Sequence, residues 1–316
     1  MNYALEGYKL TNRIGSLIAP SWVAKKASIK FLSPKRYEIK EWEKEAEKAG
    51  TRFNLSEGVS AIRWSQSDMW SERVSNERVS NKGVSNEGDS NEKSSNNVTP
   101  DSPKQILLVH GWESRATQMY GLIKGLVKQG YSVVAVDMPG HGHSTGNTSN
   151  AYVFSQAVAL AQQELGHFHA IIGHSMGAGA AGIAVGKGVK TDKLVLISGP
   201  SSIENVLRRF SGFVGLNNNA THKFIEFIGQ YVGVSAVEMD ATKLLQASDI
   251  PTLLIHDEHD FEVPVSESAR LAAVFNQSEL FVTKGLGHRN ILKSDEVFAK
   301  ISCFVNEEVK LLVKIV

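Results

Sequence analysis

The sequence predicts an α/β protein whose sheet is mostly parallel and doubly wound, with helices on both faces. From residue 106 onward, short runs rich in Val, Ile and Leu alternate with helix-prone segments. Such uninterrupted apolar strands are typical of parallel sheets that are covered on both sides. The predicted strands are residues 106–109, 131–136, 170–172, 193–197, 252–255 and 279–282. Ligands bind these sheets at the carboxyl ends of the strands, and the candidate motifs follow such ends.

The composition argues against several classes of function. The chain has 316 residues and a formal net charge of +1, from 34 basic and 33 acidic residues. This balance disfavours a nucleic-acid-binding face, which requires clustered positive charge. Cys303 is the single cysteine, so no disulfide can form within the chain, and we expect a cytoplasmic protein. The apolar run around it, residues 297–305, predicts a helix that buries the thiol.

Residues 1–66 are predicted to hold N-terminal helices and the first hairpin of the main domain. The longest uncharged run, residues 14–24, is too short to span a bilayer, so we expect no transmembrane segment. Residues 17–32 predict an amphipathic segment that docks on the protein body, with attachment to a membrane surface as the alternative. Its apolar residues are Leu17, Ile18, Trp22, Val23, Ile29, Phe31 and Leu32.

A helix and a hairpin are predicted before the next composition change. Residues 34–49 are charged and helix-prone, and Gly50 suits the end of a helix. Residues 51–55 and 60–64 flank Ser-Glu-Gly, which favours two paired strands joined by a short turn.

Residues 67–104 are predicted to form a disordered linker inside the domain. From Val74 a polar five-residue unit recurs, beginning Val-Ser-Asn-Glu-Arg and Val-Ser-Asn-Lys-Gly. A period of five fits neither a helix nor a strand. Units this polar bury too little apolar surface to offset the loss of backbone entropy. A repeat-built binding array is the alternative, but such arrays use longer units with apolar anchors.

The stretch Gly173-His-Ser175-Met-Gly177 lies between an apolar strand and a helix rich in Ala and Gly. The pattern Gly-x-Ser-x-Gly is typical of a nucleophile elbow, a sharp turn that lifts a serine hydroxyl above the sheet. Side chains at the two glycine positions would clash with a neighbouring strand or helix. We predict Ser175 as the nucleophile; a tight turn without catalytic function is the alternative.

An oxyanion hole is predicted beside this serine. The strand at 106–109 ends in His-Gly111-Trp112, where the glycine lets the backbone turn over the nucleophile. The backbone amides of Trp112 and Met176 are the expected donors to a developing oxyanion. The alternative is an ordinary turn in which Trp112 forms a pocket wall.

Two aspartates compete for the acidic position after the strand at 252–255. Asp260 lies in the loop beyond the strand tip and before Val-Pro, where it can reach across to a histidine. Asp257 lies at the turn itself. A serine nucleophile needs an imidazole base, and that imidazole needs an acceptor that fixes its tautomer. We therefore predict Asp260 as the acid.

His288 is the predicted base, because it lies on a glycine-bearing loop after the last strand. His256 and His259 are the closest competitors, and the His174 side chain is expected to point away from the serine hydroxyl. No spacing typical of a metal site is present in the sequence, so we predict no metal.

Taken together, these motifs resemble the α/β-hydrolase superfamily, in its esterase, lipase and acyltransferase-like branch. The matching segments are Leu107-Leu-Val-His-Gly-Trp112, Val136-Asp-Met-Pro-Gly-His-Gly-His-Ser144, Gly173-His-Ser-Met-Gly177, His256 to Pro264 and Gly287-His288. The resemblance covers roughly residues 106–305. It implies an eight-stranded, mostly parallel sheet, a triad in the chain order Ser175, Asp260, His288, and no cofactor. Asp257 departs from the family, which often has glycine at that position, and so does the linker between the presumed second and third strands.

The resemblance also implies a core over residues 105–316 with a helical cap at 201–249. The insertion is rich in apolar residues, which suggests an uncharged, apolar, small-molecule ester as substrate. We expect cleavage of a small or medium carboxylic ester through an acyl-enzyme on Ser175. Thioester or amide hydrolysis, or acyl transfer, by the same triad stays open. A different class is a catalytically silent binding protein of this fold, or a scaffold for the repeats.

Overall fold

The strands form one eight-stranded sheet in the order β1-β2-β4-β3-β5-β6-β7-β8. The computed structural model describes residues 3–67, 103–246 and 248–307, so nearly all of the predicted linker at 67–104 lies outside the described residues. β1 and β2 pair antiparallel, β2 pairs antiparallel with β4, and every other pairing is parallel. The predicted fold class is confirmed. The strands are β1 Thr51–Asn54, β2 Ser60–Trp64, β3 Gln105–Val109, β4 Ser132–Val136, β5 Phe168–His174, β6 Thr191–Ile197, β7 Thr252–Asp257 and β8 Ser278–Thr283.

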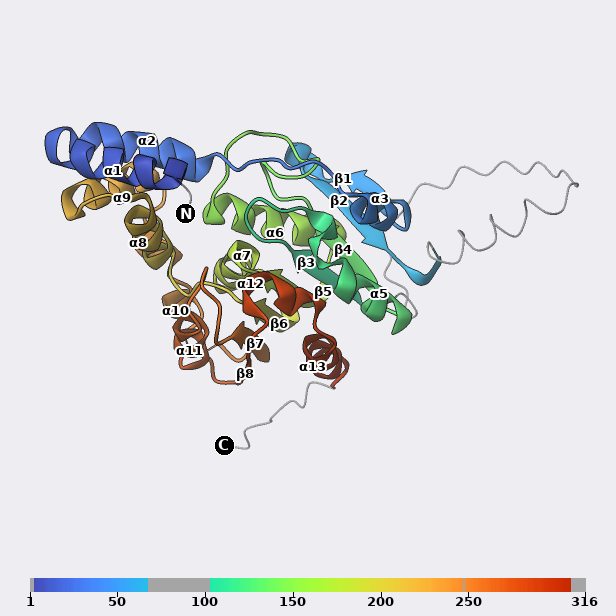
Figure 1. Ribbon diagram of the computed structural model, residues 1–316. Coiled ribbons are helices and arrows are strands. Elements are labelled where there is room, and N and C mark those ends of the chain that lie inside the picture. Colours follow the sequence, from blue (N-terminus) through green and yellow to red (C-terminus); the bar gives the residue numbers. More distant parts are fainter. Residues whose placement is uncertain (1–2, 68–102, 247, 308–316) are drawn as a thin grey trace, which may run out of the picture.

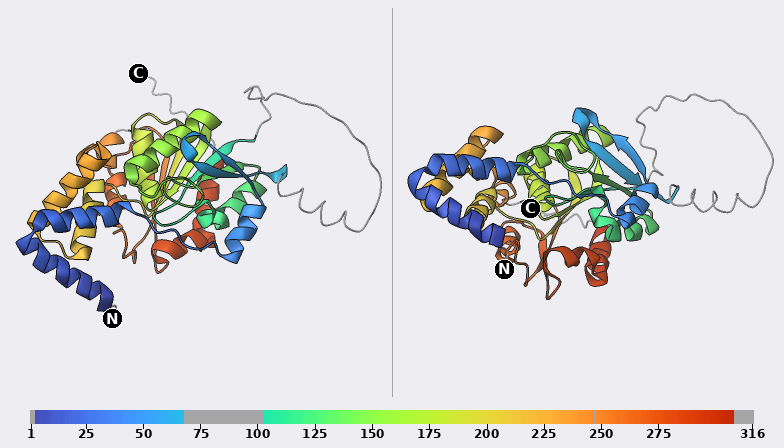
Figure 2. Two further views of the ribbon diagram at one scale, coloured as in Figure 1. Left: turned by 90° about the horizontal axis from the view of Figure 1, so that it is seen from above. Right: turned by 45° about the horizontal axis from the view of Figure 1, so that its top comes forward.

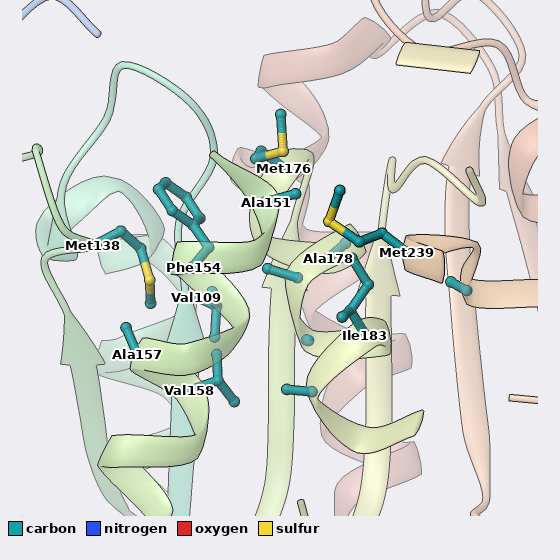
Figure 3. Close-up of a cluster of buried hydrophobic side chains, with 14 of the residues drawn as sticks. Val109, Met138, Ala151, Phe154, Ala157, Val158, Met176, Ala178, Ile183 and Met239 are labelled. Atoms are coloured by element: carbon teal, nitrogen blue, oxygen red, sulfur yellow. The ribbon is translucent and has the colours of Figure 1, made fainter. Parts of the chain in front are cut away.

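The helices cover both faces of this sheet (Figure 1). Side chains alternate between the faces, so Leu107 and Val109 of β3 join one apolar core, while Ile106 and Leu108 join the other. α6 and α7 cover the first core, part of which Figure 3 shows, and α5 and α13 cover the second. The helices are α1 Tyr3–Ile18, α2 Pro20–Leu32, α3 Glu41–Lys48, α5 Tyr120–Lys128, α6 Ala151–Leu165, α7 Met176–Gly186, α8 Ile203–Val214, α9 Asn218–Val232, α10 Ala241–Leu244, α11 Ser266–Ala272, α12 Gly287–Asn290 and α13 Asp295–Asn306.

Two local predictions need correction. The predicted helix at 34–49 is only α3, and the residues before it run without helix along the core. There the Arg36 guanidinium donates to the carbonyls of Gly142, Ser144 and Gly146, which fixes this segment against a loop.

The prediction that Cys303 is buried is wrong, because its side chain is exposed. The buried residues of α13 are Val297, Ile301 and Val305, which are spaced by one helical turn. Cys303 lies two positions from Ile301, and two residues correspond to more than half a turn. The apolar run around the thiol therefore wraps the helix and does not form one face.

The ends of the undescribed segment 68–102 attach far from the carboxyl edge of the sheet. β2 pairs with β4 through Trp64 and Val133, and β3 pairs with β4 through Gln105 and Ser132. Both attachment points therefore lie beside the first residues of β4. Two strand spacings separate them, or about 10 Å.

The insertion at 201–249 contains α8, α9 and α10, and the N-terminal helices pack against it (Figures 1 and 2). Phe31 of α2 meets Phe210 of α8 edge-on at 5.0 Å between ring centroids and Phe224 of α9 at 5.8 Å. α1 and α2 form the outer layer of this helical group (Figure 2). No helix in the described part of the chain is both long and apolar enough to cross a membrane.

Candidate active site

Ser175 lies in a sharp turn between β5 and α7. Its φ of 56° and ψ of −124° are uncommon for a residue with a side chain. A Cβ on Gly173 would lie 2.6 Å from the Cα of Ala178, and one on Gly177 would lie 2.2 Å from the carbonyl oxygen of Val109. The predicted clashes at the two glycine positions are confirmed. This crowding holds the hydroxyl at the N-terminus of α7.

Ser175, His288 and Asp260 meet above the carboxyl edge of the sheet. The Ser175 Oγ lies 2.8 Å from Nε2 of His288, and Nδ1 of His288 lies 2.7 Å from Oδ2 of Asp260. In this arrangement the hydroxyl donates to Nε2, while Nδ1–H donates to the carboxylate. The three residues follow three different strands, β5, β7 and β8, and both His288 and Asp260 are buried.

Asp260 is held as an ionised acceptor. Its Oδ1 accepts hydrogen bonds from the amides of Glu262 and Val263, both at 2.9 Å. Burial alone would raise the pKa of Asp260, but the neighbouring side chains of His256 and His288 and the Val263 amide outweigh burial and hold this pKa below its ordinary value. The carboxylate is thus prepared to stabilise a positive charge on His288.

Gly111 lets the backbone after β3 approach the nucleophile closely. A Cβ at this position would lie 3.0 Å from the Cβ of Ser175. The two amides predicted for the oxyanion hole, those of Trp112 and Met176, donate no backbone hydrogen bond to a described residue. Both are therefore available to a ligand. The indole of Trp112 stacks on the ring of Phe31 at 6.2 Å between ring centroids, so this side chain also contacts α2.

Comparisons with known proteins agree with this fold. The profile of the Alpha/beta hydrolase family matches residues 106–301. The chain belongs to this family. A curated non-heme haloperoxidase of Rhodococcus erythropolis is 26% identical over 260 residues, which cover 65% of this chain and 93% of that protein. A non-heme chloroperoxidase of Kitasatospora aureofaciens is 25% identical over 235 residues, covering 58% and 85%.

Solved structures share the fold of this α/β hydrolase. An esterase of Pyrococcus furiosus superposes with a TM-score of 0.56 at 20% identity, covering 87% of this chain and 97% of that one. Est1E from Butyrivibrio proteoclasticus, in a structure with ferulic acid bound, gives a TM-score of 0.52 at 18% identity, covering 65% and 88%. At these identities the likeness concerns the fold alone.

Asp257 of the hydrolase supports the loop that carries His288. This carboxylate ends β7 and accepts hydrogen bonds from the Thr283 hydroxyl at 2.8 Å, the Leu286 amide at 2.9 Å and the Gly285 amide at 3.2 Å. Burial opposes its ionisation, but the amides of Leu286 and Gly287, the Thr283 hydroxyl and the His259 amide lower the pKa of Asp257 to about 2. The sequence showed this aspartate only as a rival of Asp260. Its role depends on a loop that is distant in the chain.

His174 supports the same loop from below. Its Nε2 lies 2.8 Å from the backbone carbonyl of His288, which makes it a donor to the loop and directs it away from the Ser175 hydroxyl, as predicted. Burial, followed by the neighbouring His288, lowers the pKa of His174 to about 3, so the ring is neutral.

The competing histidines make other contacts. His256 is buried and bonds to the Ser268 hydroxyl at 2.7 Å and the Val263 carbonyl at 2.8 Å. His259 lies at the surface beside Glu258. Neither bonds to Ser175. Within residues 3–67, 103–246 and 248–307, no cluster of three or more His, Cys, Asp or Glu side chains suits a metal ion.

Asp137 is a supporting residue that the sequence analysis did not single out. This buried carboxylate accepts from the amides of Ala116 at 2.7 Å and His143 at 3.0 Å, and it pairs with Arg52 at 2.9 Å. It thereby joins the loop after β3 to the loop after β4. Its signal was the segment Val136-Asp-Met-Pro-Gly, which places a charged residue directly after a buried strand.

Proposed function

We propose that this α/β hydrolase cleaves a small or medium carboxylic ester through an acyl-enzyme on Ser175. The observation that carries the proposal is the continuous chain of contacts from Ser175 through His288 to Asp260, at 2.8 and 2.7 Å. These are the distances that proton transfer between a nucleophile and a general base requires. The free amides of Trp112 and Met176 support it further.

In the proposed mechanism, the Ser175 oxygen attacks the ester carbonyl while His288 Nε2 takes the hydroxyl proton. The amides of Trp112 and Met176 bind the resulting oxyanion. Its collapse breaks the bond to the alcohol, and His288 returns the proton to that leaving group. His288 then deprotonates a water molecule, which attacks the acyl-enzyme. The bond between the acyl carbon and the Ser175 oxygen breaks, His288 gives its proton to that oxygen, and the acid leaves the restored enzyme. Asp260 stabilises the imidazolium in both halves.

Covalent labelling tests the nucleophile directly. A fluorophosphonate should label the folded protein at Ser175, with the site established by peptide mapping, and Ser175→Ala should abolish labelling and lower ester turnover by more than about 10³-fold. Ser278→Ala is the matched control, because Ser278 is an exposed serine at the opposite end of β8. Labelling elsewhere, or undiminished turnover by Ser175→Ala, would contradict the proposal.

A panel of acyl donors separates the ester reaction from its close alternatives. We expect p-nitrophenyl esters, from acetyl to palmitoyl, to be turned over faster than matched thioesters and anilides. A preference for thioesters or anilides, or transfer of the acyl group to an added alcohol, would assign the same triad to those reactions. The absence of turnover and of labelling in folded protein would favour a binding protein.

A second candidate function comes from the curated relatives, which are named haloperoxidases. Oxidation of halide with hydrogen peroxide and a carboxylic acid, measured by chlorination of monochlorodimedone, tests it. If this activity depends on the same site, Ser175→Ala should abolish it. Halide oxidation that survives this substitution would separate it from Ser175.

A further inference from the structure

In α1 the buried residues are polar and one exposed face is apolar, which is the reverse of the usual pattern in a surface helix. Its buried residues are Asn12 and Ser16, and both face the helical cap. The Asn12 amide donates to the carbonyl of Val214 at 2.7 Å, and the amide of Asn217 donates to the Ser16 carbonyl at 3.0 Å. The opposite face carries an exposed apolar stripe whose residues recur at one or two helical turns, namely Tyr3, Leu10, Ile14, Leu17 and Ile18.

α2 continues this exposed surface next to α1. The two helices are in close contact, since a Cβ on Gly15 would lie 2.6 Å from a methyl group of Val23. Val23 and Leu32 are buried, whereas Trp22 is 57% exposed and Ile29 is 60% exposed. The apolar stretch predicted to dock on the protein body is therefore only partly buried. Half of the large hydrophobic side chains that are exposed among the described residues lie in α1 and α2.

Basic residues accompany these apolar side chains. Lys25 and Lys26 are exposed and lie between Trp22 and Ile29 on one face of α2. The Lys26 ammonium lies 4.2 Å from the Trp22 ring, and the Lys30 ammonium lies 4.1 Å from the ring of Tyr8. Aromatic rings with adjacent cations are typical of segments that lie at a membrane–water interface.

The charge of this surface identifies the kind of partner. α1 and α2 carry five basic residues, Lys9, Arg13, Lys25, Lys26 and Lys30, and one acid, Glu6, which gives +4. The whole chain has +1, so the rest has −3. A symmetric contact between two copies through this surface would bring like charges together. A partner with an anionic surface and an apolar interior would pair with the lysines and also cover the exposed apolar stripe.

We propose that the N-terminal hairpin, α1 and α2, docks on the surface of an anionic phospholipid bilayer. The apolar side chains enter the boundary between headgroups and acyl chains, and the lysines contact the lipid phosphates. The hairpin lies flat on the membrane and does not cross it. Phe31 of α2 contacts Trp112, so docking would bring the cap and the region above Ser175 close to the lipid.

Vesicle flotation of full-length protein tests this surface. Ser175→Ala serves as the background, so that hydrolysis of lipid cannot alter the vesicles, and the result is independent of the proposed ester chemistry. We expect binding to phosphatidylcholine vesicles that contain phosphatidylglycerol, weaker binding at high salt, and little binding to phosphatidylcholine alone.

Matched variants assign the binding to the hairpin. Lys25→Gln with Lys26→Gln should weaken the vesicle affinity by roughly 30-fold, whereas Lys124→Gln with Lys128→Gln, which alters two exposed lysines of α5, should not. Leu17→Gln with Ile18→Gln should weaken it by about tenfold or more. Vesicles should also shift the tryptophan emission to shorter wavelength, and Trp22→Gln should remove this shift while Trp42→Gln, which alters an exposed tryptophan of α3, retains it.

Three results would overturn the proposal. The first is a folded protein that binds neither vesicle type. The second is equal loss of binding by the hairpin and α5 lysine variants, which would indicate nonspecific charge attraction. The third is a dimer that Leu17→Gln with Ile18→Gln disrupts, in a protein that binds no vesicles, which would assign the surface to a second copy.

Discussion

The proposed catalytic edge of the sheet and the N-terminal hairpin differ from ordinary burial in opposite ways. At the catalytic edge Asp257, Asp260 and His288 are buried, and each has hydrogen-bond partners. At the hairpin, Leu17 is 79% exposed and Ile18 is 80% exposed, while the polar Asn12 is buried. Buried charges are unfavourable unless they are paired, and exposed apolar groups are unfavourable until they are covered. Both arrangements are therefore unfavourable for folding alone, and we relate the first to the proposed chemistry and the second to the proposed membrane contact.

The largest expected effect within this comparison is at Asp260. We expect Asp260→Asn to lower kcat for the ester by about 10³- to 10⁴-fold, because the amide neither fixes the His288 tautomer nor stabilises its charged form. Steady-state kinetics measures the loss, and circular dichroism serves to show that the protein is folded. A loss below tenfold would remove Asp260 from the triad.

Asp257→Asn should affect stability more than catalysis. We expect a loss of about 1–3 kcal/mol in the free energy of unfolding, because several amide and hydroxyl donors lose a charged acceptor, and a smaller fall in kcat than for Asp260→Asn. Urea unfolding and kinetics on both variants measure the two quantities. An effect on kcat as large as that of Asp260→Asn would show that the two carboxylates are not separated in role.

The pH dependence of the free energy of unfolding should reveal that His174 and His141 are buried in the neutral form. The pKa of His174 falls to about 3 from an ordinary 6.5, first through burial, and that of His141 falls to about 3 for the same first reason. Between these values the unfolded chain binds more protons than the folded one, so the free energy of unfolding should fall as the pH falls from about 6.5 toward 3.

Asp257 should change the free energy of unfolding in a lower pH range than the histidines do. Its pKa of about 2 lies below the ordinary 3.8, so its contribution to stability is present above pH 3.8 and is lost as the pH falls toward 2. Urea unfolding at a series of pH values separates the two ranges. A free energy of unfolding that stays constant from pH 7.5 to about 4.5 would contradict the neutral, buried state of the histidines.

Changes in the hairpin should leave the catalytic edge unaffected. We expect Leu17→Gln with Ile18→Gln to keep kcat for a water-soluble ester within about twofold, since substitutions at exposed sites usually change stability by less than about 0.5 kcal/mol. The same protein should lose vesicle binding. A large fall in soluble-ester turnover would show that the two regions are coupled through the contact between Phe31 and Trp112.

The smallest effect is expected from the repeats. We propose that residues 68–102 serve as a linker, and that replacing them with a short Gly-Ser segment leaves ester turnover and stability nearly intact, because their ends attach on either side of β4. Kinetics and thermal unfolding of the shortened chain measure this. A large loss of either would assign these residues a role in the fold or the site.

The sequence was sufficient for features that depend on neighbours in the chain. The apolar runs predicted six of the strands, the flanking residues predicted the hairpin before them, and the pattern around Ser175 predicted its turn. The strand ends predict the contact between Ser175, His288 and Asp260, since parallel strands bring these ends together, and the resemblance to α/β hydrolases implies their chain order. β5 extends beyond its apolar run because its central position buries His169 and His174 as well.

The features that the sequence missed depend on distant contacts. To predict that Asp257 supports the loop of His288, one must know where β8 ends. To predict that α1 buries polar residues, one must know that Val214 and Asn217 lie beside it. Similarly, the residues before α3 look helix-prone but form no helix, and the Arg36 guanidinium ties them to the Ser144 carbonyl. Local propensity cannot predict such outcomes because tertiary contacts override it.

The attachment of the repeats beside the start of β4 has a consequence for the evolution of the chain. Tandem copies of a short unit are gained and lost by slippage during DNA replication, and a unit of five codons preserves the reading frame whichever way it changes. The repeats attach far from the carboxyl edge of the sheet, so a change in their number does not directly alter the residues at that edge. Close relatives of this protein are therefore expected to differ in repeat number more readily than at any residue around Ser175.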